Sequence, residues 1–346
     1  MLDLVFRLLI HIKKENYQKN KKYTMAHYSI KDVEHLSGVK AHTLRIWEQR
    51  YDIFQPHRTD TNIRYYSDED LKIIICISAL ISQGYKIGNI AKMTKSSIQE
   101  HLQNIANKDY SFDIQIKALT TAMIDVDEPY FEKIINIAIA SIGFEDTMIN
   151  VIFPFLERIG IMWLTGAVNP AQEHFISNLI RQKIIAAIDK LEVNEHLPQK
   201  KYLLYLPEGE MHEISLLFLA FLLKKRNNRI TYLGANVPLG DVVSVTKHAK
   251  PHYTCSIFTA NPANDVEGYV NHLGANAPES EHLFAGQRFS NLNIEMPDNC
   301  QYISSIQNML DFINANSAPL IIHQQQSDNS EQSATGAADS INTTYQ

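Results

Sequence analysis

The stretch Leu206-Pro-Glu-Gly-Glu-Met-His-Glu-Ile-Ser215 separates a short apolar run at residues 202–206 from an apolar helical run at residues 216–223. Further short apolar runs alternate with helical stretches, at residues 229–233, 253–258, 282–285 and 301–304. Such alternation predicts βα units and a parallel sheet. In a doubly wound sheet, a loop that follows a strand lies at the carboxyl edge, where ligands bind. We therefore expect residues 206–215 to form a ligand loop.

His212 and Glu210 are the chemically informative side chains of this loop. An imidazole can bind a metal through one ring nitrogen while a carboxylate holds the other. The zinc-protease pattern His-Glu-x-x-His is not completed, because Leu216 stands where the second His would be. Taken alone, an isolated loop histidine more often has an ordinary surface role, so both interpretations stay open at this point.

The pattern of the preceding region, residues 105–190, predicts helix throughout. Apolar residues recur three to five positions apart, as on one buried helix face: Phe175, Leu179, Ile180, Ile184 and Ile188. Asn169 and Pro170 suit the N-cap and first position of a helix, and Gln172 completes a capping box.

Trp163 therefore ends one helix, while Glu173 and His174 lie in the first turns of the next. The three side chains can converge at that corner. A core tryptophan beside a capping acid would explain the same pattern without a ligand, and the sequence pattern by itself favours that simpler reading.

The N-terminal region has the pattern of a helix-turn-helix followed by a wing. Ser29 is placed as an N-cap, and Gly38 ends the first helix in a turn. A second helix at residues 40–50 turns Leu44 and Trp47 inward. Its outward residues are suited to the major groove: Lys40, His42, Thr43, Arg45 and Arg50. Residues 55–66 read as a hairpin-like wing that carries Arg58, Arg64 and Tyr65.

Composition bounds the remaining possibilities. The 346 residues suffice for two or three domains, and 32 Lys and Arg against 38 Asp and Glu give a net charge of −6. Contact with nucleic acid must therefore come from a local patch, and residues 40–64 carry five basic against three acidic residues. Three cysteines without C-x-x-C spacing exclude a disulfide framework and a cysteine zinc cluster, and they fit a reducing cytoplasm. No apolar run approaches the ~18 residues of a membrane span, so we expect a cytoplasmic protein without membrane contact.

Residues 28–71 resemble the winged-helix DNA-binding domain of the MerR family of transcription regulators. The match lies in Thr43-Leu-Arg-Ile-Trp-Glu-Gln-Arg-Tyr51 and in Ile63-Arg-Tyr-Tyr-Ser-Asp-Glu-Asp-Leu71. The resemblance implies that Arg45 works from the recognition helix, and that Arg58, Arg64 and Tyr65 grip phosphates from the wing. It also implies a double-stranded DNA operator as the partner.

Residues 201–315 resemble the cobalamin-binding domain of methionine synthase and related proteins, which has a Rossmann-like (flavodoxin-like) fold. The family's loop reads (Asp/Glu)-x-His-x-x-Gly, which implies His212 as the lower cobalt ligand and Glu210 as its hydrogen-bond partner. The chain departs from the pattern at three places. Ser215 replaces the family's Gly, only Gly286 remains of a common Gly pair, and Ser256-Ile-Phe258 stands for Ser-x-Leu. These departures put the affinity for cobalamin in doubt, though not the fold.

Beside such a loop, the spacing of Trp163 and Glu173-His174 resembles the Trp-x9-Glu-His motif of the light-sensing cobalamin repressors of the CarH/LitR type. That resemblance implies that Trp163 packs against the upper ligand and Glu173 helps to hold its adenosyl group. His174 would take the vacant cobalt position once light removes that group.

The two resemblances together predict a multidomain α and α/β protein. Its parts are an N-terminal extension (1–25), a winged-helix DNA-binding domain (26–100), a helical bundle that caps the corrin (105–192), a Rossmann-like cobalamin-binding domain (200–318) and a disordered tail (319–346). We favour Met25 as the true start, with residues 1–24 as upstream sequence or a disordered arm; a short membrane-surface helix is the alternative.

The predicted function is a homo-oligomeric (dimeric or tetrameric) repressor, not an enzyme, that responds to adenosylcobalamin and to light. One alternative is a cobalamin-independent regulator whose degenerate cobalamin module serves oligomerisation or protein partnership. Another is a corrinoid methyl-carrier or isomerase subunit, against which the DNA-reading head argues.

Overall fold

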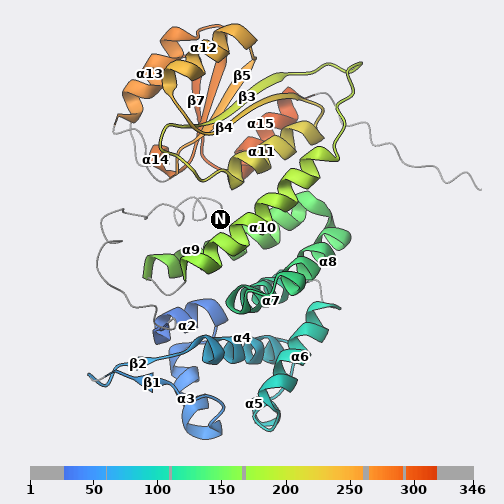
Figure 1. The fold of residues 1–346 in the computed structure, drawn as a ribbon, viewed down its shortest axis with the longest axis vertical. Helices are drawn as coiled ribbons and strands as arrows, with labels where there is room; N and C mark the ends of the chain where they lie inside the picture. Colours follow the sequence, from blue (N-terminus) through green and yellow to red (C-terminus); the bar gives the residue numbers. More distant parts are fainter. Residues whose placement is uncertain are drawn as a thin grey trace, which may run out of the picture.

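The computed structural model describes residues 27–59, 61–108, 111–165, 169–259, 265–290 and 294–317, with only the backbone described for 161–165 and 290. The predictions for residues 1–25 and 319–346 lie outside this set. The described elements form three tiers, with the head lowest, a helical bundle in the middle and a sheet flanked by helices at the top (Figure 1).

The lowest tier comprises α2 (Ile30–Ser37), α3 (Ala41–Tyr51), β1 (His57–Arg58), β2 (Arg64–Tyr65), α4 (Asp68–Ser82), α5 (Ile87–Ile90) and α6 (Lys95–Ala106). The middle tier comprises α7 (Phe112–Asp125), α8 (Glu128–Thr147), η2 (Met148–Ile152), α9 (Phe153–Thr165) and α10 (Pro170–Asp189). The strands of the upper tier are β3 (Lys201–Pro207), β4 (Arg229–Val237), β5 (Tyr253–Ile257), β6 (Glu281–Ala285) and β7 (Cys300–Ile303). Its helices are α11 (Ile214–Lys225), α12 (Leu239–Ala249), α13 (Val266–Asn276), α14 (Gln287–Ser290) and α15 (Ile306–Asn316).

Local capping chemistry sets the helix boundaries of the head. Ser29 forms a capping box with Asp32 at the start of α2, and Gly38 ends that helix with φ 73°. Lys40 offers α3 no side-chain cap; instead the carboxylate of Glu34 accepts the Ala41 N–H at 3.0 Å. The wing strands β1 and β2 pair antiparallel, which confirms the predicted winged helix-turn-helix.

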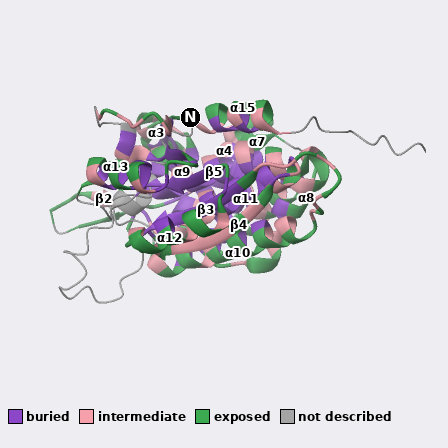
Figure 2. Cartoon of the chain, turned by 90° about the horizontal axis from the view of Figure 1, so that it is seen from above, coloured by how far each residue is buried: buried purple, intermediate pink, exposed green. Residues whose placement is uncertain are grey.

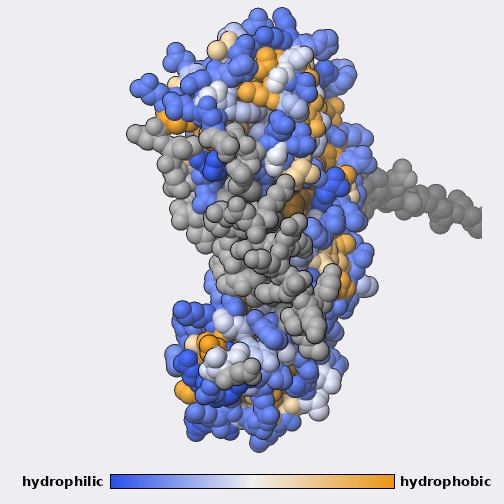
Figure 3. Space-filling model, turned by 60° about the vertical axis from the view of Figure 1, so that its left-hand side comes forward, coloured by the Kyte–Doolittle hydropathy of each residue, from blue (hydrophilic) through white to orange (hydrophobic). Residues whose placement is uncertain are grey.

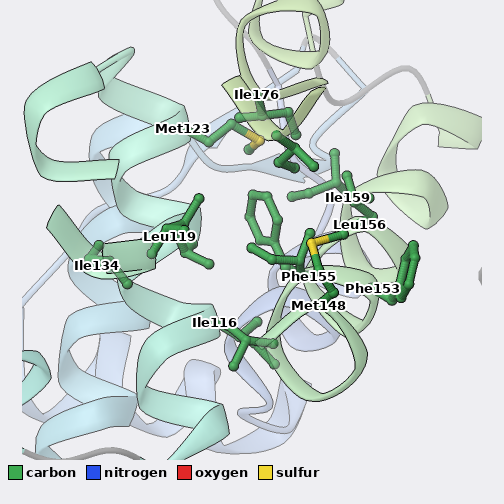
Figure 4. Packing of buried hydrophobic residues seen from close by; sticks show 14 of the residues in the cluster. Ile116, Leu119, Met123, Ile134, Met148, Phe153, Phe155, Leu156, Ile159 and Ile176 are labelled. Carbon is green, nitrogen blue, oxygen red and sulfur yellow. The ribbon is translucent and has the colours of Figure 1, made fainter. Parts of the chain in front are cut away.

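The bundle is built around a core to which α7, η2, α9 and α10 all contribute (Figure 4). Phe155 of α9 lies among Leu119 of α7, Met148 of η2 and Ile176 of α10. The run Glu128–Gly160 is long and apolar enough for a membrane span by length and composition alone, so the expectation that no such run exists was wrong. Gly143 interrupts that run with φ 80° and ψ 165°. The buried residues of the run belong to the bundle core.

The five strands of the upper tier are parallel in the order β4-β3-β5-β6-β7. Counted within the sheet this order is 2-1-3-4-5, that of flavodoxin-like folds, so the predicted Rossmann-like architecture is confirmed. Seen from above, β3 and β5 are buried, whereas the edge strand β4 is mainly intermediate (Figure 2). β4 is longer than the run at residues 229–233, because irregular pairing with β3 carries it across Gly234 (φ 83°) and Asn236 (φ 59°).

Candidate functional site

The loop between β3 and α11, which we call the His212 loop (residues 208–213), is organised around a buried carboxylate. Glu210 is fully buried, and its Oε1 lies 2.6 Å from Nδ1 of His212 and accepts the His212 backbone N–H at 3.0 Å. The imidazole is 26% exposed. Glu210 therefore fixes the orientation of a histidine that solvent or a ligand can reach.

The other carboxylate oxygen is held from across the sheet. Oε2 of Glu210 accepts the backbone N–H of Thr259 at 2.9 Å and its hydroxyl at 2.6 Å. Thr259 follows β5, which pairs with β3 on the side opposite to β4. The strand order of the sheet reverses between β3 and β5, at the position where doubly wound folds bind ligands.

His212 keeps one ring nitrogen available. Its Nδ1 faces the Glu210 carboxylate, and within the described residues its Nε2 has no hydrogen-bond partner. A proton on Nδ1, donated to the carboxylate, leaves a lone pair on Nε2; we assign this tautomer from the hydrogen-bond network. That is the arrangement of a metal-binding histidine with a carboxylate behind it.

Asn236 of β4 also forms hydrogen bonds with the same loop, from the side of the sheet opposite to β5. Its side-chain oxygen accepts the Gly209 N–H at 2.7 Å, and its backbone N–H donates to the Glu210 carbonyl at 3.1 Å. Asn tolerates the left-handed backbone that this position requires. Three neighbouring strands thus hold the loop.

The three positions compared above with the family pattern lie at different depths. Ser215 is partly exposed in the first turn of α11, whereas Ser256 is buried inside β5. Gly286 has φ 104°, and a Cβ there would lie 2.3 Å from the carbonyl oxygen of Phe258. Packing alone therefore accounts for this glycine.

Three buried hydroxyls lie between the sheet and α13, those of Tyr205, Ser256 and Tyr269. Ser256 pairs in register with Tyr205, and burial, followed by the neighbouring Tyr269, raises the pKa of Tyr205 well above its ordinary value. None of the three forms a hydrogen bond of normal geometry. The three hydroxyls are one another's polar neighbours, because Tyr269 and Ser256 are the side-chain hydrogen-bonding groups that act on the pKa of Tyr205.

On the bundle side, the predicted capping box at Asn169 and Gln172 starts α10 as expected. Glu173 and His174 lie in its first turns, with Oε2 of Glu173 3.2 Å from Nδ1 of His174, and the His174 side chain is 73% exposed. Trp163 lies in the last turn of α9, but its side chain is outside the described residues. The structure therefore places two of the three motif residues together.

The recognition helix α3 presents the side chains that the sequence predicts. Leu44 and Trp47 are buried, whereas Lys40, His42, Arg45 and Arg50 are exposed and Thr43 is partly buried. Ile46, which sequence reasoning missed, is 44% exposed beside Arg45. The head surface is mainly hydrophilic, with isolated hydrophobic side chains (Figure 3).

The wing residues differ in how firmly they are held. Arg64 pairs with Glu48 of α3, with Nε 3.3 Å from Oε2, so it braces the wing against the recognition helix. Arg58 is exposed and donates to Asn62 at 2.8 Å. Tyr65 stacks on His57, with ring centroids 5.3 Å apart.

Sequence reasoning also missed Thr259 and Asn236. A usable signal existed, since both follow or end a strand at the carboxyl edge where the His212 loop lies. Choosing them from other edge residues requires the strand order.

Two family models match parts of the chain. Residues 28–97 match the family model described as MerR HTH family regulatory protein, and residues 115–187 match the model described as B12 binding domain. The second range covers the bundle from α7 to α10, and neither range reaches the sheet.

Two Myxococcus xanthus proteins are similar over most of the chain. The HTH-type transcriptional repressor CarH is 26% identical over 266 residues, which cover 75% of this chain and 88% of CarH. The HTH-type transcriptional repressor CarA is 26% identical over 231 residues, which cover 66% of this chain and 75% of CarA. Among solved structures, the monomethylamine corrinoid protein of Methanosarcina barkeri has a TM-score of 0.44 and 12% identity, covering 62% of this chain and 96% of that one.

The chain is thus a transcription regulator that joins a MerR-type helix-turn-helix domain to a B12-binding domain, and it is similar over most of its length to the CarH and CarA repressors.

Proposed function

We propose that this protein is a cytoplasmic repressor that binds double-stranded operator DNA as a homo-oligomer and changes state with the upper ligand of a bound cobalamin. The observation that carries the proposal is the His212–Glu210–Thr259 arrangement, in a protein that also has a B12-binding bundle and a MerR-type head.

The donor set of the loop supports cobalamin over a free ion. The loop offers one imidazole nitrogen, whereas a free structural or catalytic zinc takes three or four protein donors. A corrin ring would supply most of the ligands of its cobalt, so a single donor from the protein would suffice. His212 would be that donor on the lower side, and Glu210 would raise its basicity.

The bundle supplies the residues for the upper side. Glu173 would help to hold the upper ligand, Trp163 would pack against it, and His174 would be the replacement donor when that ligand is lost. When bound, adenosylcobalamin supplies a cobalt–carbon bond that light breaks. The exposure of His174 supports its part, because its Nδ1 lies against Glu173 while 73% of the side chain remains accessible to a ligand.

DNA release requires that the two cofactor states favour different protein states, because a ligand shifts an equilibrium only by its differential affinity. The head is the output: the exposed face of α3 would read base edges, while Arg58 and Arg64 would contact phosphates from the wing. Regulation rather than catalysis is the function that these parts support.

Absorption spectroscopy tests the lower-ligand assignment. We expect wild-type protein to take up adenosylcobalamin in the dark with an imidazole-ligated spectrum, and His212→Ala to lose most of its affinity. His248→Ala, on the exposed face of α12, is the matched control and should bind as wild type does. Equal uptake by His212→Ala and wild type would overturn the assignment.

Illumination tests the upper face. Wild-type protein should convert to a bis-imidazole cobalt(III) spectrum, whereas His174→Ala should show a water-ligated spectrum that responds to added imidazole. Identical illuminated spectra would remove His174 from the proposal. Gel shifts in the dark and after green light would then show whether operator binding follows the spectral change.

The second candidate function is a cobalamin-independent regulator in which the sheet unit serves oligomerisation or protein partnership. Ser215 favours it, because a side chain stands where the family has glycine, and Gly286 is explained by packing alone. Purified protein that stays colourless with excess cobalamin would favour this candidate.

A further inference from the structure

Glu213 directly follows His212 and occupies the N-cap position of α11, yet its side chain caps nothing. Instead Oε1 of Glu213 accepts a hydrogen bond from Nε of Arg181 in α10, and Oε2 accepts one from the Tyr232 hydroxyl at 3.3 Å. An acidic N-cap residue ordinarily accepts the free N–H groups of its own helix. Here the carboxylate is turned away from α11 toward the bundle.

Arg181 and His174 lie on one face of α10. They are seven residues apart, which is within about 20° of two full turns, and their positions are separated by roughly 10 Å along the helix axis. The same face of α10 thus carries His174, which is predicted to act on the upper side of the cofactor, and Arg181, which binds Glu213 of the His212 loop.

We propose that Arg181 is a positioning residue. Through Glu213 it connects the helical bundle to the His212 loop. The placement of α10 and the orientation of His212 therefore depend on each other. This inference rests on the proposed function, because it assigns a structural link between the two sides of the same cofactor site. It adds a residue that neither motif contains.

The rest of α11 makes such a link effective. At its far end, Arg226 is bound to Glu145 of α8, so both ends of α11 are tied to the bundle. Its apolar side packs against α10 along the length between them. A displacement of α10 therefore acts on α11, and through Glu213 on the preceding residue, His212.

Stability alone is a poor measure of this link. The Arg181 side chain is 47% exposed, and exposed ion pairs contribute little to folding free energy. An ion pair of low energetic weight can still restrict where a loop sits, so the test must report on the loop itself.

The first arm uses the full chain without cofactor and measures hydrogen exchange in residues 208–216. The variants are Arg181→Met, which keeps the aliphatic stem, Glu213→Gln, and the two combined. We expect each single variant to speed exchange by about three- to tenfold, and the double variant to add little, as contacting residues do. Lys183→Met is the matched control: Lys183 is on the same helix, but its partner at 2.8 Å is Glu132 within the bundle.

The second arm measures how fast the bis-imidazole spectrum appears after illumination of protein loaded with adenosylcobalamin. Arg181→Met and Glu213→Gln should slow its appearance by a similar factor, at least about threefold, and Lys183→Met should match wild type.

The outcomes separate the two claims. Unchanged loop exchange in both single variants, additive effects in the double variant, or an equal effect of Lys183→Met would each overturn the link. A wild-type protein that takes up no cobalamin would overturn the proposed function, while the exchange arm would still decide whether Arg181 positions the loop.

Discussion

Arg226, the residue after α11, donates to both carboxylate oxygens of Glu145 in α8, with Nη2–Oε1 at 2.9 Å and Nη1–Oε2 at 3.3 Å. Lys225 adds a third contact, 2.7 Å from Oε2. Arg226 is 7% exposed and also donates to Asn314 of α15 at 2.7 Å. A bidentate ion pair between Arg226 and Glu145 therefore joins the bundle to the sheet unit.

Glu145→Gln should destabilise the protein by about 3 kcal/mol, the scale for a buried pair that loses one partner, because Arg226 would keep a buried charge. The urea unfolding midpoint of the full chain measures this loss. Glu195→Gln is the control: its pair with Arg229 is largely exposed and should contribute less than about 1 kcal/mol. Similar midpoint shifts for the two variants would show that the buried pair has no special weight.

The same carboxylate predicts a pH dependence. Burial by itself would raise the pKa of Glu145, but the hydrogen bonds from Arg226 and Lys225 outweigh it and lower the pKa below the ordinary 4.5. A lowered carboxyl pKa contributes stability that is present above 4.5 and is lost as the pH falls through the folded-state value. The stability difference between wild type and Glu145→Gln should therefore shrink as the pH falls below 4.5. A difference that grows on acidification would contradict the assignment.

Thr259→Val should weaken cobalamin binding by about tenfold, as the loss of a partner behind a metal ligand typically does. The substitution keeps side-chain volume and the backbone N–H bond but removes the hydroxyl that donates to buried Glu210 at 2.6 Å. Spectroscopic titration with cobalamin measures the affinity. Thr246→Val, which removes a buried hydroxyl in α12, is the control and should bind normally; equal affinities for the two variants would count against the Glu210–Thr259 link.

Gly286→Ala should destabilise the sheet unit by about 2 kcal/mol or more, from a strained left-handed backbone and overpacking. The added Cβ would lie 2.3 Å from a backbone oxygen, which cannot move aside as a flexible side chain could. Gly240→Ala in α12 is the control, because its Cβ would meet nothing within 4 Å. Thermal unfolding compares them, and a neutral Gly286→Ala would refute the packing explanation.

Substitutions of two arginines of the head should change DNA binding in different ways. Arg45→Ala should cost about 1–3 kcal/mol and relax sequence preference, as the loss of a base-edge contact does. Arg64→Ala should weaken binding to all sequences more evenly and flatten the salt dependence, as the loss of a phosphate contact does, and it also removes the brace on Glu48. Gel shifts over a salt series with specific and random duplexes measure both effects, and wild-type behaviour of both variants would mean that DNA binds elsewhere.

The sequence by itself determined which elements form and where the capped helices begin. Ser29 and Asn169 start their helices as predicted, and Ser67 starts α4 in the same way, each in a capping box that reaches only three residues along the chain. Apolar periodicity likewise depends on near neighbours, so it predicted the inward side of α3 and the five parallel strands. The Glu210–His212 contact could be predicted for the same reason, because the two residues are two positions apart.

Only the tertiary structure decided which distant residues complete the site. Thr259 meets Glu210 across 49 residues because β5 lies beside β3, and no local pattern records that neighbour. Arg181 reaches Glu213 because α10 packs on α11, and Gly286 is required because the backbone of Phe258 passes beside it. Hydrogen-bond and contact forces act over a few ångströms, so they follow strand order and helix packing rather than distance along the chain.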